Sequence, residues 1–144
     1  MGGDPRLYLR WGLSCHNVRM GFRDFITNKL PGISVDDALL ALSKGSVLID
    51  VRTENEYLAG HAPGARPINP KDLADDPLEA IHGDDPLAER DAPIIITCDN
   101  GLRSGVLAAE LRKRGLLAES IKGGLVAWQR AGNPIIPGPY RRRR

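Results

Sequence analysis

The chain has 144 residues, of which 42% are hydrophobic and 26% are charged. This length suits one domain with a single core, and the composition is that of a globular protein rather than a disordered one. A formal net charge of +2 does not call for a nucleic-acid partner, and no run approaches the roughly 18 apolar residues of a membrane span.

The two cysteines, Cys15 and Cys98, lie far apart in the sequence. They show neither a CxxC pair nor a Cys/His ligand spacing, so we expect no disulfide framework and no metal site. Free thiols favour a reducing compartment, and we therefore expect a cytoplasmic protein. The N-terminus lacks the apolar core of a signal peptide, while the basic residues among 1–29 leave a transit peptide as an alternative.

Residues 1–30 show no clean hydrophobic period. We interpret them as an N-terminal extension that is either partly disordered or packed on the domain. We place the domain at residues 31–137. Residues 138–144 form a basic C-terminal tail, and its run of arginines is typical of a solvated segment.

The first expected helix follows Ser34, which is suited to cap its N-terminus with Asp37 three residues on. Gly45 ends this helix. Its predicted inward face consists of three leucines, Leu39, Leu40 and Leu42.

A short buried strand is expected at 47–50, and Thr53 with Glu56 then forms a capping-box pattern that opens a short helix. Residues 60–69 are rich in glycine and proline, which predicts a turn that runs into a short strand. Prolines and a glycine interrupt 70–92, where we expect one or two short surface helices.

The second half of the chain alternates strands with helices. Residues 94–97 are apolar throughout, as in a parallel strand covered on both faces, and 118–122 predict a last short strand. Helices are expected at 103–114 and 123–132. Their predicted inward side chains are Val106, Leu107 and Leu111 in the first, and Leu125, Val126 and Trp128 in the second. This alternation indicates an α/β fold with a mainly parallel sheet.

Cys98 ends the strand at 94–97, and in such folds ligands bind beyond the carboxyl ends of the strands. The loop 99–102 leads directly into a helix, whose N-terminus and backbone amides favour anions. Gly101 permits a positive φ that turns amides inward, and Arg103 adds a cation at the rim.

A helix N-terminus and a nearby arginine lower the pKa of a cysteine thiol from about 8.5 to about 4–7. We therefore expect Cys98 to react as a thiolate. The alternative is an ordinary buried cysteine. The combination of strand end, glycine loop, arginine and helix start favours the reactive cysteine.

Three segments together resemble the rhodanese domain over residues 32–137. They are "LIDVRTENEYLAGHAPGARPIN" (48–69), "CDNGLRSG" (98–105) and "GGLVAWQRAGNPI" (123–135). The resemblance implies a three-layer α/β fold with a mainly parallel, five-stranded sheet and helices on both faces. It also implies a sulfurtransferase that carries sulfur as a persulfide on Cys98, without a metal or an organic cofactor.

The resemblance assigns roles to the loop residues. Cys98 and Arg103 are the expected catalytic pair, because Arg103 matches the basic residue that closes the loop. Asp50 and Arg52 match residues that brace this edge. The loop residues expected to cradle the outer sulfur are Asp99, Asn100, Gly101, Leu102 and Ser104. Ser104 could instead serve only to open the helix.

Related phosphatases on this fold use a loop one residue longer, so phosphatase chemistry fits the present loop poorly. Many thiosulfate-using members have a basic residue after the cysteine, where this chain has Asp99. Its charge disfavours a dianionic donor, and a persulfide donor suits the rim better than thiosulfate. The expected acceptor is a thiol or a protein thiol. A non-catalytic module for partner binding or redox sensing is the alternative, and the oligomeric state stays open.

Three other residues are weaker candidates. His61 is a possible general base, but its "GHAPGA" setting resembles a packed turn and attack by a thiolate needs no base. Trp128 is predicted to belong to the core. Cys15 has no spacing that would make it a resolving thiol.

Overall fold

The computed structural model describes residues 32–141, and its centre is a parallel sheet. Four strands run across this sheet in the following order: β2 (Arg66–Pro67), β1 (Val47–Asp50), β3 (Ile94–Thr97) and β4 (Ala118–Ser120). Next to β4, Ile33 forms a single parallel bridge with Ile121. The sheet of the described residues thus has four strands and one bridge at its β4 edge, where the resemblance implies five strands.

The register of the sheet brings the carboxyl ends of its strands together. Asp50 pairs with Pro67 of β2 on one side and with Thr97 of β3 on the other. All four residues of β3 are buried, as its unbroken apolar sequence predicts for a central parallel strand. The residues that follow β1 and β3 therefore emerge at the same edge.

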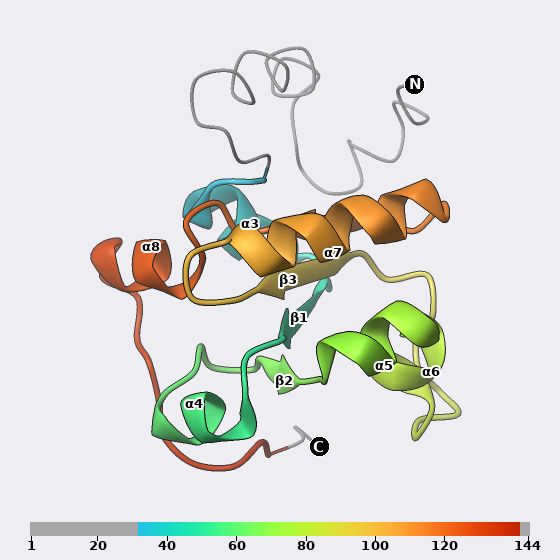
Figure 1. The fold of residues 1–144 in the computed structure, drawn as a ribbon, viewed down its shortest axis with the longest axis horizontal. Helices are drawn as coiled ribbons and strands as arrows, with labels where there is room; N and C mark the ends of the chain where they lie inside the picture. The colour runs from blue at the N-terminus through green and yellow to red at the C-terminus, as the bar shows by residue number, and fades with distance from the viewer. Residues whose placement is uncertain (1–31, 142–144) are drawn as a thin grey trace.

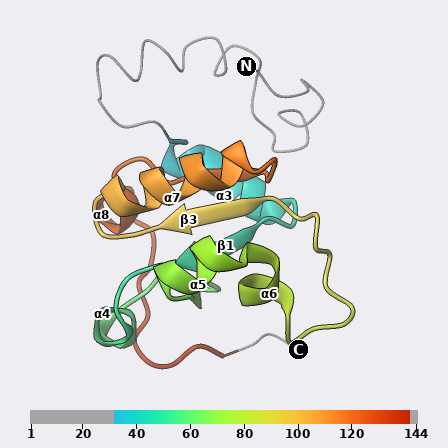
Figure 2. The same cartoon turned by 45° about the vertical axis from the view of Figure 1, so that its right-hand side comes forward.

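Helices cover both faces of the sheet, as expected for this fold class (Figure 1). Ile49 and Ile96 belong to a core cluster with buried residues of α5 (Pro70–Asp75), α6 (Pro77–His82) and α7 (Leu102–Lys113). The opposite cluster joins Leu48 and Ile95 to residues of α3 (Val35–Ser43), α4 (Glu54–Ala59) and α8 (Gly124–Arg130). Figure 2 shows α7 lying along β3, the strand that ends at the cysteine.

The helix starts follow the local sequence signals. Ser34 caps α3 by accepting a hydrogen bond from the backbone amide of Asp37. Thr53 and Glu56 form the predicted capping box of α4. The segment 70–92 contains two short helices, each with a proline in its first turn.

The predicted inward faces of three helices are partly wrong. In α3 the buried residues are Val35, Ala38 and Ala41, whereas Leu39 and Leu40 are 38% and 43% exposed. Alanines let a helix backbone approach the sheet closely, and the bulky leucines then face outward. The other two misplaced side chains are Val106, which is 72% exposed, and Val126, which is 42% exposed.

The remaining inward predictions for these helices agree with the structure. Leu111 of α7 is fully buried, Leu107 is half-buried, and Leu125 and Trp128 of α8 are buried. The Trp128 indole donates a hydrogen bond to the Pro134 carbonyl at 3.0 Å, so its one polar group is satisfied. Among the helices of residues 32–141, none has the length and apolar character to cross a membrane.

Candidate active site

Cys98 follows β3 directly and lies at the carboxyl edge of the sheet, with only 1% of its surface exposed. Three hydrogen-bond donors reach its sulfur, and the side-chain oxygen Oδ1 of Asn100 lies 4.0 Å from Sγ as a possible acceptor. The backbone N–H groups of Gly101 and Ser104 donate to Sγ at 3.2 and 3.5 Å, and the Ser104 hydroxyl lies 3.3 Å from Sγ. Donors that converge on one sulfur stabilise negative charge there.

The loop reaches this geometry through Gly101 and Asn100. Gly101 has φ = +87°, as expected, and it stands at the N-terminus of α7. The Asn100 side chain accepts a hydrogen bond from the Leu102 amide at 3.0 Å, which holds the turn that precedes the helix. The Leu102 amide is thus engaged by Asn100, while the amides of Gly101 and Ser104 point to the sulfur.

The N-terminus of α8 supports the loop from behind. The amides of Leu125 and Val126 donate to the carbonyl oxygens of Cys98 and Asp99 at 2.8 and 3.0 Å. These bonds satisfy two loop carbonyls with orphan donors of the helix start. They also hold the start of the loop against α8.

Asp50 and Arg52 form a buried ion pair at the same edge. The Arg52 guanidinium donates to both carboxylate oxygens of Asp50, with its closest contact at 2.8 Å, and donates to the Gly60 carbonyl at 2.6 Å. Burial alone would lower the pKa of Arg52, but the hydrogen bonds and charge of Asp50 outweigh burial and raise this pKa. This arginine is therefore a fixed cation that ties the end of β1 to the end of α4.

Arg52 also reaches the rim of the loop. Its Nη1 lies 3.5 Å from the Asp99 carboxylate, which is half exposed. Burial is the largest cause that raises the pKa of Asp99, and a hydrogen bond with Glu56 is the next largest. The same hydrogen bond lowers the pKa of Glu56. Asp99 and Glu56 thus form a carboxyl pair that holds one proton more readily than two isolated acids would.

Arg103 lies at the rim with an exposed side chain. Its charge favours the ionised forms of both Asp99 and Glu56, as the smallest of the influences on the pKa of each, so Arg103 lies near the carboxyl pair. The rim consequently carries two arginines and two carboxyls within one small region. Its charge balance depends on whether the carboxyl pair holds its proton.

Among the described residues, no hydrogen bond joins the side chain of His61 to the sulfur. His61 is buried and stacks on Tyr57 at a ring-centroid distance of 3.8 Å, and its Nδ1 lies 2.9 Å from the Tyr57 carbonyl. Its surroundings are those of the packed turn that the sequence indicates. Cys15 lies outside the described residues.

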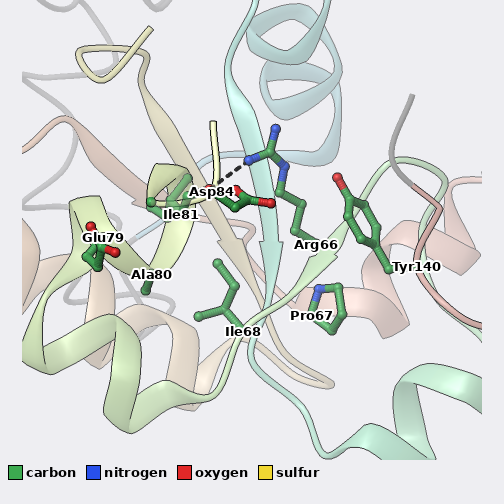
Figure 3. Close-up of a pocket in the computed structure, with 9 residues that line it drawn as sticks. Arg66, Pro67, Ile68, Glu79, Ala80, Ile81, Asp84 and Tyr140 are labelled. Atoms are coloured by element: carbon green, nitrogen blue, oxygen red, sulfur yellow. Dashed lines mark hydrogen bonds between the residues drawn. The ribbon is translucent and has the colours of Figure 1, made fainter. Parts of the chain in front are cut away.

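A hollow beside the sheet lies apart from the cysteine loop. A cavity of about 440 Å³ lies between β2, α6 and Tyr140, and none of the loop residues lines it (Figure 3). Within it, Arg66 donates to the Ile81 carbonyl at 2.9 Å. In residues 32–141 we find no cluster of histidine, cysteine or carboxylate side chains with the arrangement of a metal site.

Sequence reasoning missed two residues that shape the site. Glu56 is visible in the sequence as part of a capping box, but its contact with Asp99 depends on how α4 sits beside the loop. Gly124 lies in the third family segment, and its backbone packs against the loop so closely that an added side chain would collide with it. A glycine pair at the start of a helix, Gly123 and Gly124, is the signal that could have indicated it.

Comparison with known proteins agrees with this geometry. The family model for the rhodanese-like domain matches residues 34–131. The thiosulfate sulfurtransferase GlpE of Pseudoalteromonas translucida is 36% identical over 101 residues, which are 69% of this chain and 89% of that protein. A tRNA sulfurtransferase of Desulfurococcus amylolyticus is 34% identical over 103 residues, 72% of this chain but only 18% of that protein.

Solved structures share the fold. A rhodanese-related protein from Thermoplasma volcanium superposes with a TM-score of 0.59 at 24% identity, over 73% of this chain and 96% of its own. The Alr3790 protein of Anabaena gives a TM-score of 0.60, also at 24% identity, over 73% of this chain and 81% of its own. At this level of identity the likeness establishes the architecture.

Proposed function

The chain belongs to the rhodanese-like family, and on that premise we propose that it is a sulfurtransferase that carries a sulfane sulfur on Cys98. The observation that supports this most directly is the set of donors around Cys98 Sγ, two amides and one hydroxyl within 3.5 Å. In the proposed reaction the loop stabilises the sulfur anion, and no metal or cofactor takes part. The names of the sulfurtransferases that resemble this chain support the same reaction class.

The reaction proceeds in two displacements at sulfur. The Cys98 thiolate attacks the outer sulfur of the donor, the donor's S–S bond breaks, and its electron pair leaves with sulfite or a thiolate. The new bond joins Cys98 Sγ to the transferred sulfur. An acceptor thiolate, or cyanide in an assay, then attacks that sulfur, and the electron pair of the broken bond returns to Sγ.

The charge of the carboxyl pair at the rim affects which sulfur donor can approach Cys98. Asp99 and Glu56 place negative charge where a donor must approach, and this charge opposes thiosulfate, a dianion. A protein persulfide or a small persulfide carries less charge and meets less repulsion. We therefore propose a persulfide as the preferred donor and a thiol or protein thiol as the acceptor.

Intact-mass spectrometry tests this function. After incubation with a persulfide donor, the wild-type protein should gain the mass of one sulfur atom, and a reducing thiol should remove it. Cys98→Ser should show no gain, whereas Cys15→Ser should behave as the wild type does. A protein that gains no sulfur would instead be a binding module of the same fold.

Kinetics give a second test. Because the donor product leaves before the acceptor enters, double-reciprocal plots at different acceptor concentrations should be parallel. Intersecting lines would indicate a ternary complex and would contradict a persulfide carried on the enzyme.

A further inference from the structure

Two buried serines connect the cysteine sulfur to the carboxyl end of β4. Ser104 lies in the first turn of α7 and Ser120 ends β4, and their hydroxyl oxygens are 2.7 Å apart. Both side chains are buried, with exposed fractions of 0% and 1%. The Ser104 hydroxyl lies 3.3 Å from Cys98 Sγ, and the Ser120 hydroxyl lies 3.4 Å from the Ile121 carbonyl.

Each of these hydroxyls has one hydrogen to donate, and burial keeps bulk water away. A neutral thiol at Cys98 can donate to Ser104 or, at the longer distance of 4.0 Å, to Asn100 Oδ1. In the first case the hydrogens run on from Ser104 to Ser120 and from Ser120 to the Ile121 carbonyl. With an anionic sulfur, Ser104 must donate to Sγ. Its oxygen is then free to accept a hydrogen from Ser120.

When the hydrogens point from Ser120 to Ser104 and from Ser104 to Sγ, every acceptor in the chain still has a hydrogen-bond donor. Ile121 loses only the long contact from Ser120, because its carbonyl also accepts a hydrogen bond from the Gly124 amide at 2.9 Å. The short bond between the two serines persists in both directions. The two hydroxyls can therefore turn together without losing a strong hydrogen bond.

We propose that Ser120 is a positioning residue for the sulfur-transfer reaction, because it supplies the hydrogen bond that turns the Ser104 hydroxyl toward an anionic Cys98. This inference rests on the proposed function. Negative charge resides on Sγ in the free enzyme and returns there when the acceptor takes the outer sulfur. In the persulfide the charge lies on the outer sulfur, so the hydrogen bond from Ser104 to Sγ contributes less. Only hydroxyl hydrogens rotate, and no proton is transferred.

The test measures alkylation of Cys98 by iodoacetamide against pH, in a Cys15→Ser background, with peptide mass spectrometry to locate the label. Ser120→Ala should shift the midpoint of the profile to higher pH and slow alkylation below the midpoint by about 3–10-fold, as for the loss of part of a hydrogen bond to a charged group. Ser104→Ala should have at least as large an effect. This readout needs no sulfur donor, so it remains decisive even if no sulfurtransferase activity is found.

The double variant separates positioning from packing. If Ser120 acts through Ser104, adding Ser120→Ala to Ser104→Ala should change the profile no further. An undiminished effect of Ser120→Ala in that background would overturn the proposal, as would an unchanged profile in the single variant. If Ser120→Ala does not fold, Ser120→Cys keeps the volume with a weaker donor and enters the same cycle.

Thr97→Val is the matched control. Thr97 is also a buried hydroxyl at the carboxyl edge of the sheet, but it donates to the Cys98 backbone carbonyl at 3.2 Å and not to the sulfur. Its removal should leave the midpoint in place. A shift as large as that of Ser120→Ala would show that any lost hydroxyl at this edge disturbs the site, and would contradict a specific chain through Ser104.

Discussion

Gly124 presses its backbone against the carbonyl oxygen of Cys98, so that a methyl group on Gly124 would overlap that oxygen. The same methyl group would stand 2.7 Å from the Asp99 carbonyl oxygen and 2.7 Å from the Gly101 amide nitrogen. Gly124 also has φ = +56°, in the left-handed region. The start of α8 and the loop that follows Cys98 are thus fitted to each other through a position that only glycine can occupy.

Replacing Gly124 with alanine should therefore damage both stability and the site. The left-handed conformation alone costs about 1–2 kcal/mol in a residue with a Cβ, and the collision adds to this. Gly115→Ala is the control, because Gly115 has φ = +87° and nothing within 4 Å of an added Cβ. Urea denaturation should show a clearly larger loss for Gly124→Ala. Equal losses would mean that the loop moves away without penalty.

Much of the fold can be predicted from the sequence because its signals are local. The capping box of Thr53 and Glu56, the two short helices of 70–92 and the buried strand at 94–97 each depend on neighbouring residues. The inward face of α3 does not. Hydrophobicity selects Leu39 and Leu40, whereas the distance between helix and sheet selects the small Ala38.

The site shows the same division. Cys98, Gly101 and Ser104 lie within seven consecutive residues, so a loop with this chemistry is recognisable in the sequence. Ser120 is sixteen positions from Ser104, and it reaches that hydroxyl only because β4 pairs with β3 while α7 packs on both. A short sequence motif cannot predict such a contact between residues that are distant in the chain.

Asp99 should disfavour thiosulfate as a donor. Asp99 directly follows Cys98 in the sequence, and its carboxylate forms an ion pair with Arg52 at 3.5 Å. Asp99→Arg reverses the charge and should lower KM for thiosulfate by about 3–10-fold with a smaller change in kcat, because repulsion acts on binding. Asp99→Asn should give an intermediate value.

Salt distinguishes charge from loop shape in these variants. A charge at the rim is screened over a Debye length of about 8–10 Å at 0.1–0.15 M salt, so the gain in KM should shrink as ionic strength rises. A neutral persulfide donor should respond little to either variant. Equal gains with both donors, or a gain that salt does not change, would show that Asp99 acts on the shape of the loop.

The carboxyl pair should make thiosulfate use depend on pH. Burial and then the hydrogen bond with Glu56 raise the pKa of Asp99, and the same hydrogen bond lowers the pKa of Glu56. The pair therefore passes from one negative charge to two as pH rises. KM for thiosulfate should increase over that step. Glu56→Gln keeps a side chain suited to the capping box but removes one charge. Without the Glu56 carboxyl beside it, Asp99 has a lower pKa than in the wild type. Its KM should therefore vary less with pH.

The control for this experiment is Glu54→Gln, which removes the same charge from the exposed first turn of α4. Ratios of KM between variant and wild type at each pH cancel the ionisation of Cys98 itself. Glu54→Gln should keep the slope of the wild type. If Glu56→Gln keeps that slope as well, the pair does not govern the charge of the rim.

His82 should make the protein less stable in mild acid. It is buried at the end of α6, and neither ring nitrogen has a hydrogen-bond partner among the described residues. Burial, followed by the charges of Arg66 and Arg90, lowers its pKa, and the charges of Asp84 and Asp85 only partly oppose this. As pH falls through the unfolded-state pKa of about 6.5, the unfolded chain binds the proton first. Stability is therefore lost as pH falls, by about 1.4 kcal/mol for each unit that separates the two pKa values.

His82→Leu removes this titration and fills the same apolar surroundings, where Ile81 is also buried. The free energy of unfolding, measured by urea denaturation at pH 7.5 and pH 5.5, should fall less in the variant than in the wild type. The comparison uses the difference between the two pH values within each protein, so a change in packing that affects both equally drops out. The same loss of stability in both proteins would contradict this prediction. It would show that His82 has the same pKa in the folded and the unfolded chain, because the buried ring finds a hydrogen-bond partner in solution.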